Sequence, residues 1–345
     1  MKTKMHFLKH YISTDARQTL RSIIYTPQRF IDLLINYFYD IKFYLRHSST
    51  LQFFNSEKQL NSWIDADAHK LEKGLALPQP RSGFGEGVAT RLVREIDTFI
   101  NRFGASRSVD TAIMMLGVYQ KFNLDHGVCY THLFADIDRL KKRVNLNEEL
   151  AGCDIISKRD WLASAEHDLT DFFRSRRSIR DFSDSPVLKV DIEKAIMMAI
   201  NTPTVCNRQA VKAHIFLTPA TVSAVLNCQS GNGGFGNRVK AVAVITVDRQ
   251  CFFTAGERNQ CWIDGGLFSM SFIYALHSLG LGSCCLNWSA TKRQDQKLRQ
   301  VIAIEDSEAV IMMVAIGHLK NTFKVAKSAR KPAEEFLTFE NIKKP

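Results

Sequence analysis

The sequence predicts an α+β protein whose first 150 residues are mostly helical. Two observations support this prediction. Apolar residues recur at helical spacing within 88–146, as at Val93, Ile96, Phe99 and Ile100. After residue 150, helical patterns alternate with short apolar runs typical of buried strands, at His214–Leu217, Lys240–Val247 and Val310–Ile316. We therefore divide the chain into a helical N-terminal extension, residues 1–150, and a second domain, residues 151–345.

The overall charge indicates an anionic partner. The 345 residues carry a formal net charge of +11, which suits a phosphorylated cofactor, an acidic sugar, a membrane surface or a nucleic acid. The sequence has no zinc-finger or RNP motif, so a nucleic acid is not predicted. The eight cysteines form no CxxC pair, and no HExxH pattern occurs. These features predict reduced thiols in a cytoplasmic protein without a metal site.

The first fifty residues are basic and aromatic. They contain eight Lys or Arg and three Asp, a net charge of 8 − 3 = +5. Apolar residues follow helical spacing over Pro27–Arg46. Two interpretations stay open: residues 1–46 make peripheral contact with an anionic membrane, or this helix packs on its own domain or a partner subunit. No run reaches the roughly 18 apolar residues that a membrane-spanning helix needs, and no secretory signal peptide is recognised.

The segment from Asp65 to Gly87 combines a helix with a loop. The helix is expected to stop at Gly74, and the glycines and prolines that follow predict a polar connection. This loop either reaches toward a substrate or is a plain surface connection. Farther along, Asp110 is a candidate N-cap for a helix.

The segment Arg174-Ser-Arg-Arg-Ser-Ile-Arg-Asp-Phe182 concentrates positive charge. It holds four arginines and one acid in nine residues. Such a cluster repels itself unless solvent screens it or an anion binds there. Arginine presents a planar fork of donors that matches phosphate oxygens. Two interpretations of this segment stay open when it is considered by itself: it binds an anion, or it is the solvated end of a basic helix.

Five further motifs follow this segment in a characteristic order. They are Asn201-Thr-Pro-Thr-Val-Cys-Asn-Arg-Gln209, Asp264-Gly-Gly266, Leu279-Gly-Leu-Gly-Ser-Cys-Cys-Leu-Asn-Trp288, the apolar run Ala309–Gly317, and Lys327-Ser-Ala-Arg-Lys-Pro332. The series resembles the nitroreductase superfamily of FMN-dependent oxidoreductases over about residues 165–335. The resemblance implies a central mixed sheet flanked by helices. The phrase His69-Lys-Leu-Glu-Lys-Gly74 is similar to one in nitroreductase-like proteins of surface-polysaccharide gene clusters.

The resemblance also implies a set of FMN-binding residues. Arg176 and Ser178 match positions that bind the phosphate and ribityl chain, Arg177 and Arg180 are near matches, and Arg330 matches a late arginine that closes on the phosphate. The loop whose amides meet the flavin edge is matched by Pro203, Thr204, Asn207 and Gln209. Leu286 and Asn287 match the loop over flavin N5. No metal site and no general acid or base is implied.

Other expectations concern charge and assembly. Arg208, inside the flavin-edge loop, is expected to favour an anionic substrate. The glycine-dense segment Ser230–Gly236 lacks the dinucleotide and P-loop patterns and is interpreted as a loop near the active site or a plain turn. The apolar helix predicted at Trp262–Leu279 belongs in the centre or at a dimer interface. The tail, Phe336–Pro345, is expected to cross to a partner subunit.

The activity implied by the resemblance is hydride transfer from NADH or NADPH to a small-molecule electron acceptor. The implied architecture is a homodimer with FMN at the interface, working by a ping-pong mechanism. The alternative is an FMN-binding module without turnover, in which residues 1–150 serve a polysaccharide-synthesis or membrane-associated assembly.

Overall fold

The structure is a computed structural model that describes residues 14–50, 56–77, 79–143, 151–153, 169–323, 325, 326 and 332–339. Arg330 and the end of the C-terminal tail lie outside these residues. Most of the stretch in which we placed the domain boundary also lies outside them. The predicted boundary at residue 150 and the predicted role of Arg330 therefore stay predictions.

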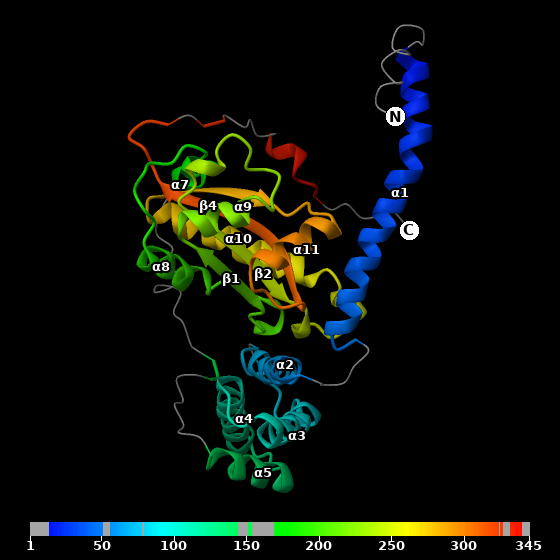
Figure 1. Ribbon diagram of the computed structural model, residues 1–345. Coiled ribbons are helices and arrows are strands. Elements are labelled where there is room, and N and C mark those ends of the chain that lie inside the picture. Colours follow the sequence, from blue (N-terminus) through cyan, green and yellow to red (C-terminus); the bar gives the residue numbers. More distant parts are fainter. Residues whose placement is uncertain are drawn as a thin grey trace.

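The N-terminal part is helical, as predicted (Figure 1). A long helix, α1 (Thr14–His47), is followed by four helices that we call the helical unit: α2 (Glu57–Leu75), α3 (Glu86–Phe103), α4 (Arg107–Asp125) and α5 (Thr131–Lys141). These four helices share one apolar core built from residues such as Leu92, Ile96 and Ile113. Each helix buries one apolar face against the others, which is how an amphipathic helix gains most of its stability.

One helix start differs from the prediction. The N-cap of α4 is Ser106, whose hydroxyl accepts a hydrogen bond from the Val109 amide at 3.3 Å. Asp110 lies inside the first turn, so its prediction as an N-cap is wrong. Both residue types are common near helix starts. Serine caps the helix with its hydroxyl, and aspartate in the first turn interacts favourably with the helix dipole. The helix begins four residues earlier because the apolar face already starts at Val109.

The second part, which we call the sheet unit, confirms the α+β class. Its four strands are β1 (Val211–Phe216), β2 (Ala241–Asp248), β3 (Leu281–Asn287) and β4 (Glu308–His318), in the spatial order β1-β2-β4-β3. All neighbouring pairs are antiparallel. The parallel part of this sheet, in the described residues, is a single bridge between Ser178 and Ser283. The helices are α7 (Thr170–Ser175), α8 (Lys189–Ala199), α9 (Pro219–Leu226), α10 (Gln260–Ser278) and α11 (Lys292–Val301).

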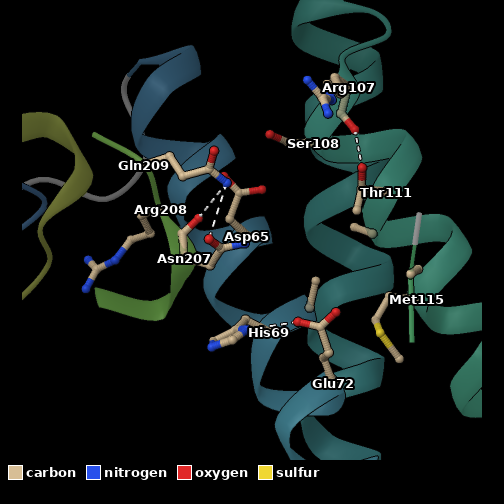
Figure 2. Close-up of a pocket in the computed structure, with 13 residues that line it drawn as sticks. Asp65, His69, Glu72, Arg107, Ser108, Thr111, Met115, Asn207, Arg208 and Gln209 are labelled. Atoms are coloured by element: carbon tan, nitrogen blue, oxygen red, sulfur yellow. Dashed lines mark hydrogen bonds and ion pairs between the residues drawn. The ribbon is translucent and has the colours of Figure 1, made fainter. Parts of the chain in front are cut away.

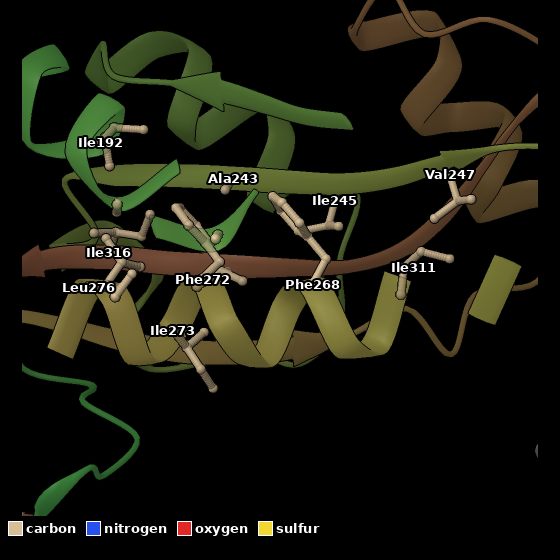
Figure 3. Close-up of a cluster of buried hydrophobic side chains, with 14 of the residues drawn as sticks. Ile192, Ala243, Ile245, Val247, Phe268, Phe272, Ile273, Leu276, Ile311 and Ile316 are labelled. Atoms are coloured by element: carbon tan, nitrogen blue, oxygen red, sulfur yellow. The ribbon is translucent and has the colours of Figure 1, made fainter. Parts of the chain in front are cut away.

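Both faces of the sheet are covered. Alternate residues of β2 point to opposite faces: Ala243, Ile245 and Val247 pack toward α8 and α10, whereas Val242 and Val244 pack toward α9 and α11. This explains why every residue of β2 is buried. Figure 3 shows α10 running under β2 and β4, with Phe268, Phe272 and Leu276 directed at the strands.

A glycine lets α10 lie close to the sheet. A Cβ atom at Gly265 would lie 2.5 Å from Cγ1 of Ile311 and 2.9 Å from Cγ2 of Val247. Any larger side chain would therefore push the helix away from β2 and β4. This close contact places the residues on α10 next to the loops at the sheet edge, where the site residues are found.

The helical unit is attached to the sheet unit through α2. Lys58 forms an ion pair with Asp248 at 2.7 Å, and the ring of Trp63 stacks on Phe253 with centroids 4.5 Å apart. The hydroxyl of Ser56, which caps α2, donates to the side-chain oxygen of Gln250 at 2.6 Å. α2 therefore lies between the apolar core of the helical unit and the end of β2.

Candidate functional site

The arginine segment runs along the edge of β3. α7 ends at Ser175, and the chain then continues extended. The Ile179 amide donates to the Ser283 carbonyl at 2.9 Å, and the buried side chains of Ile179 and Phe182 anchor the segment. Because Ile179 points inward, its neighbours Ser178 and Arg180 are directed to the other side of the segment.

The arginine segment passes the C-terminal end of α10, where Arg176 lies near His277. Burial and the nearby charge of Arg176 lower the pKa of His277, and the His277 ring nitrogen Nε2 lies 2.8 Å from the Ser175 hydroxyl. Arg177 turns its guanidinium onto the carbonyls of Arg174 and Arg176. Asp181, the acid of this segment, forms ion pairs with Arg238 and Lys320 instead.

None of the arginines in this segment has a carboxylate partner within the described residues. The ion pairs found there involve neither Arg174, Arg176, Arg177 nor Arg180. Four clustered cations without a counter-ion leave a local field that favours an anion. Ser178 lies between Arg177 and Arg180 in this segment, and its role in anion binding stays a prediction.

The second group of predicted residues lies in the loop after α8. Cys206, Asn207 and Gln209 have φ angles of 49°, 53° and 49°, and they are the only non-glycine residues with positive φ in the described part of the chain. Such conformations cost about 1–3 kcal/mol each and concentrate at functional sites. The loop stays in this shape because the Gln209 amide donates to the Thr204 hydroxyl at 3.1 Å.

Asp264 holds the same loop from α10. Its carboxylate is buried and accepts from the Val205 amide at 3.2 Å and from the Gln260 side chain at 2.8 Å. Our sequence reasoning assigned Asp264 no role. A buried acid on the first turns of an apolar helix is a signal that could have pointed to it, because such an acid needs polar partners.

Arg208 does not present a free charge to the site as we expected, although its positive charge opposes the rise in the pKa of Asp65. Its guanidinium is fully buried, forms an ion pair with Glu257 and lies 4.3 Å from the centre of the Phe253 ring. It also donates to the carbonyl of Cys251. Arg208 therefore turns away from the neighbouring Asn207 and Gln209, and it ties their loop to the segment after β2.

The third group lies at the end of β3 rather than in a loop. Leu286 is buried in the core, whereas Asn287 is exposed and its side chain donates to the Ser289 hydroxyl at 2.6 Å. The carbonyl of Asn287 accepts from the Gln229 side chain at 3.0 Å. Gln229 immediately precedes the glycine-dense segment, which is thereby placed beside Asn287.

The structure separates the arginine segment from the left-handed loop. Asp264 holds the loop near the beginning of α10, whereas Arg176 lies beside His277 near its end. At 1.5 Å per residue, these two points are about 20 Å apart along the helix. Within one chain, the predicted phosphate-binding and flavin-edge residues therefore do not converge.

A cavity of about 370 Å³ lies between the left-handed loop and the helical unit. Figure 2 shows Asn207 and Gln209 on one side, facing Asp65 of α2, with Arg107 and Thr111 of α4 across the opening. Burial raises the pKa of Asp65 to about 6, although its hydrogen bond to Ser108 acts in the opposite direction. His69 and Glu72 of α2 pair at 3.0 Å on the cavity wall.

The cavity is mostly polar. Its lining residues include carboxylates, hydroxyls, amides, an imidazole and two arginines, with Ala68, Ala112, Met115 and Ala151 as apolar members. The size lies in the range of small-molecule sites. No group of three His, Cys, Asp or Glu in the described residues could hold a metal ion. The described residues of the loop after Gly74 do not line the cavity. On this side the cavity is lined by residues of α2 instead.

Comparison with known proteins supports the sheet unit's class. A model of the nitroreductase family matches residues 173–249 and 229–318. Similar solved structures include an FMN-dependent nitroreductase from Clostridium difficile R20291, which is 22% identical; the match covers 50% of this chain and 98% of that one, with a TM-score of 0.42. No curated protein matches the chain.

Two further structures show the same extent of similarity. A protein from Desulfovibrio desulfuricans, described as a nitroreductase in complex with FMN, is 20% identical; the match covers 51% of this chain and 99% of that one, with a TM-score of 0.44. A protein from Clostridium acetobutylicum, described as an NADH oxidase, is 17% identical over 50% of this chain and 100% of that one, with a TM-score of 0.43.

The residues that the nitroreductase family model matches make up most of the α+β sheet unit. They include all four strands, the arginine segment from residue 173 onward and the left-handed loop. The helical unit lies outside the match, although its helices line the cavity next to that loop.

Proposed function

We propose that this chain is an FMN-dependent oxidoreductase that transfers hydride from NADH or NADPH to a small-molecule acceptor. The observation that carries the proposal is the cluster of Arg174, Arg176, Arg177 and Arg180, which has no carboxylate counter-ion in the described residues. The family match adds support, because it covers this segment from residue 173 onward.

The residues present fit the chemical groups of FMN. Arg176, Arg180 and Ser178 supply donors for a phosphate and a ribityl chain. Asn207 and Gln209 are exposed and can both donate and accept, as the pyrimidine edge of a flavin requires. When bound, FMN supplies the hydride chemistry, and the protein supplies position and electrostatics. Arg330 is proposed to close on the same phosphate.

We propose that the working unit is a homodimer. The two groups of flavin contacts are about 20 Å apart along α10, and a second copy that supplies one of them would bring both groups onto one flavin. The outer faces of α8 and α10 also expose large apolar side chains, among them Met197 at 68% and Ile263 at 52%. Contiguous exposed apolar surface of this kind is typical of protein interfaces.

The spectrum of the freshly purified protein tests the proposal. We expect a flavin absorbance that bleaches when NADPH or NADH is added without oxygen, and that returns when an acceptor such as menadione is supplied. A flavin that does not bleach would favour the FMN-binding module without turnover. A colourless protein that cannot be reconstituted with FMN would contradict the proposal.

The cavity between α2, α4 and the left-handed loop is proposed as the route by which donor and acceptor reach the flavin edge. In Thr111→Trp, the larger side chain narrows the cavity without touching the arginine segment. We expect normal flavin content but about tenfold or more slower bleaching and reoxidation, because both steps need close approach to the flavin. Stopped-flow absorbance measures both rates.

Thr98→Trp is the matched control. Thr98 and Thr111 both lie on helices of the helical unit, and each hydroxyl donates to the carbonyl four residues earlier, at 2.8 and 3.0 Å. Thr98 does not line the cavity. Equal rates of bleaching and reoxidation in the two variants would show that donor and acceptor do not pass through the cavity. The proposal that the protein binds FMN would be unaffected.

A further inference from the structure

α1 packs against the sheet unit mainly through one side, and Ile35 and Phe38 border the groove beside α11. The Tyr39 hydroxyl donates to Asp295 at 2.9 Å, and the Lys292 amide donates to the Asn36 side chain at 2.7 Å. The guanidinium of Arg299 lies 5.5 Å from the centre of the Phe43 ring. At 3.6 residues per turn, Asn36, Tyr39 and Phe43 share one side of the helix, and this side faces α11.

The opposite face of α1 is apolar and exposed. In Figure 1 the helix lies at the side of the sheet unit and extends beyond it. Phe38, the most exposed of its large apolar residues, is 66% accessible, and Leu33 is 52% accessible. These residues, each between 38% and 66% accessible, are Phe30, Ile31, Leu33, Leu34, Ile35, Tyr37, Phe38, Ile41 and Leu45. So large a contiguous apolar surface marks an interaction site.

The apolar face is too wide for a two-helix seam. Phe30, Leu34, Tyr37 and Ile41 follow a heptad seam, but a coiled coil flanks its seam with charged residues. Here three of the four flanking positions are apolar as well, at Ile31, Leu33 and Phe38, and Asp40 is the charged exception. Such a face suits a fluid apolar phase better than a second helix.

Positive charge borders this face. Lys42 and Arg46 on α1 are exposed, and so are Lys292 and Arg293 on the adjoining α11. Apolar residues on one face with lysine and arginine beside them are typical of helices that lie in the plane of a membrane surface. No described helix is long and apolar enough to cross a membrane, which agrees with a helix that lies on the bilayer.

We propose that α1 binds the surface of an anionic lipid bilayer. The face that includes Leu33 and Phe38 enters the boundary between headgroups and acyl chains, and the bordering lysines and arginines contact the anionic headgroups. Because α1 contacts α11 by its opposite side, it can bind lipid and the sheet unit at the same time. The inference does not depend on the proposed oxidoreductase activity.

Co-sedimentation of the full chain with vesicles tests the proposal. We expect binding to phosphatidylcholine vesicles that contain phosphatidylserine, weaker binding to phosphatidylcholine alone, and loss of binding when salt is raised from about 0.1 M to about 0.5 M. Leu33→Glu/Phe38→Glu should lower the partition coefficient by about a hundredfold, since it places two charges in the apolar phase.

Leu124→Glu is the control for Leu33→Glu made alone. Both leucines lie on helices and have nearly equal accessibility, 49% for Leu124 and 52% for Leu33. Only the change in α1 should weaken binding, and circular dichroism should show both variants folded. Vesicle binding that survives the double substitution, or binding indifferent to phosphatidylserine, would overturn the proposal. So would failure of the wild-type chain to bind any vesicle while Leu33→Glu converts a dimer into a monomer.

Discussion

Purified Arg176→Ala protein is expected to carry much less FMN than the wild-type chain. Arg176 lies half-buried beside His277 at the end of α10, in a cluster of cations without a carboxylate partner in the described residues. One charge-assisted hydrogen bond contributes about 1.5–3 kcal/mol. Its loss should raise the dissociation constant for FMN about ten- to a hundredfold. The ratio of flavin to protein absorbance after gel filtration measures the effect, and titration of apoprotein with FMN gives the constant.

Two further variants sharpen this test. Arg94→Ala removes the same side chain and charge from an exposed site on α3, and it should retain the wild-type flavin content. Arg330→Ala tests the late arginine and should also lose flavin. If both Arg176→Ala and Arg330→Ala keep a full complement of FMN while they remain folded, the assignment of the phosphate site is wrong.

Glu308→Gln is expected to destabilise the protein by about 3 kcal/mol at neutral pH. The Glu308 side chain is 1% exposed and accepts hydrogen bonds from His214 at 2.7 Å, Thr246 and Lys212 at 3.1 Å. Burial alone would raise the pKa of this carboxyl, but these partners outweigh burial and lower its pKa from 4.5 to about 2. Each unit of pKa difference corresponds to about 1.4 kcal/mol.

The same pKa shift predicts how the effect depends on pH. Because the folded-state pKa lies below the unfolded value, the ionised carboxylate stabilises the fold fully above pH 4.5. That stabilisation is lost as the pH falls from 4.5 toward about 2. The difference in unfolding free energy between the wild type and Glu308→Gln should therefore shrink between pH 7 and about pH 3, which urea titrations at both pH values can measure.

Glu305→Gln is the matched control for Glu308→Gln. Glu305 is exposed and three residues away, so its substitution should change the free energy of unfolding by less than about 0.5 kcal/mol. A Glu308→Gln protein as stable as the wild type at pH 7 would contradict the prediction. If the difference in unfolding free energy between the wild type and Glu308→Gln stayed the same at low pH, the loss of stability would come from packing rather than from charge.

Much of the secondary structure could be predicted from the sequence, because it depends on local periodicity. The apolar spacing of α10 and the apolar run of β2 are properties of short windows, and these elements were confirmed within a few residues. The helix predicted over Pro27–Arg46 was also found, but α1 begins at Thr14, well before the predicted start. The order of motifs indicated the nitroreductase type, and the family match from residue 173 to 318 supports it.

Side-chain direction was harder to predict. Arg208 lies between Asn207 and Gln209 in the sequence, so we predicted that its positive charge would face the site. The left-handed backbone around it turns its guanidinium inward to Glu257 and the Phe253 ring. Likewise, Asp110 and Ser106 are both acceptable near a helix start, and only the backbone geometry chooses between them.

The sequence by itself determined the elements of this protein and the chemical types of residue in its candidate site. The tertiary structure alone decided which of these residues lie together. It brings Asp65 of α2 to the cavity beside Gln209, separates that loop from Arg176 along α10, and gathers His214, Thr246 and Glu308 from three strands. The physical reason is that helical and strand patterns arise from neighbouring residues, whereas burial, ion pairing and cavities depend on contacts between segments far apart in the chain.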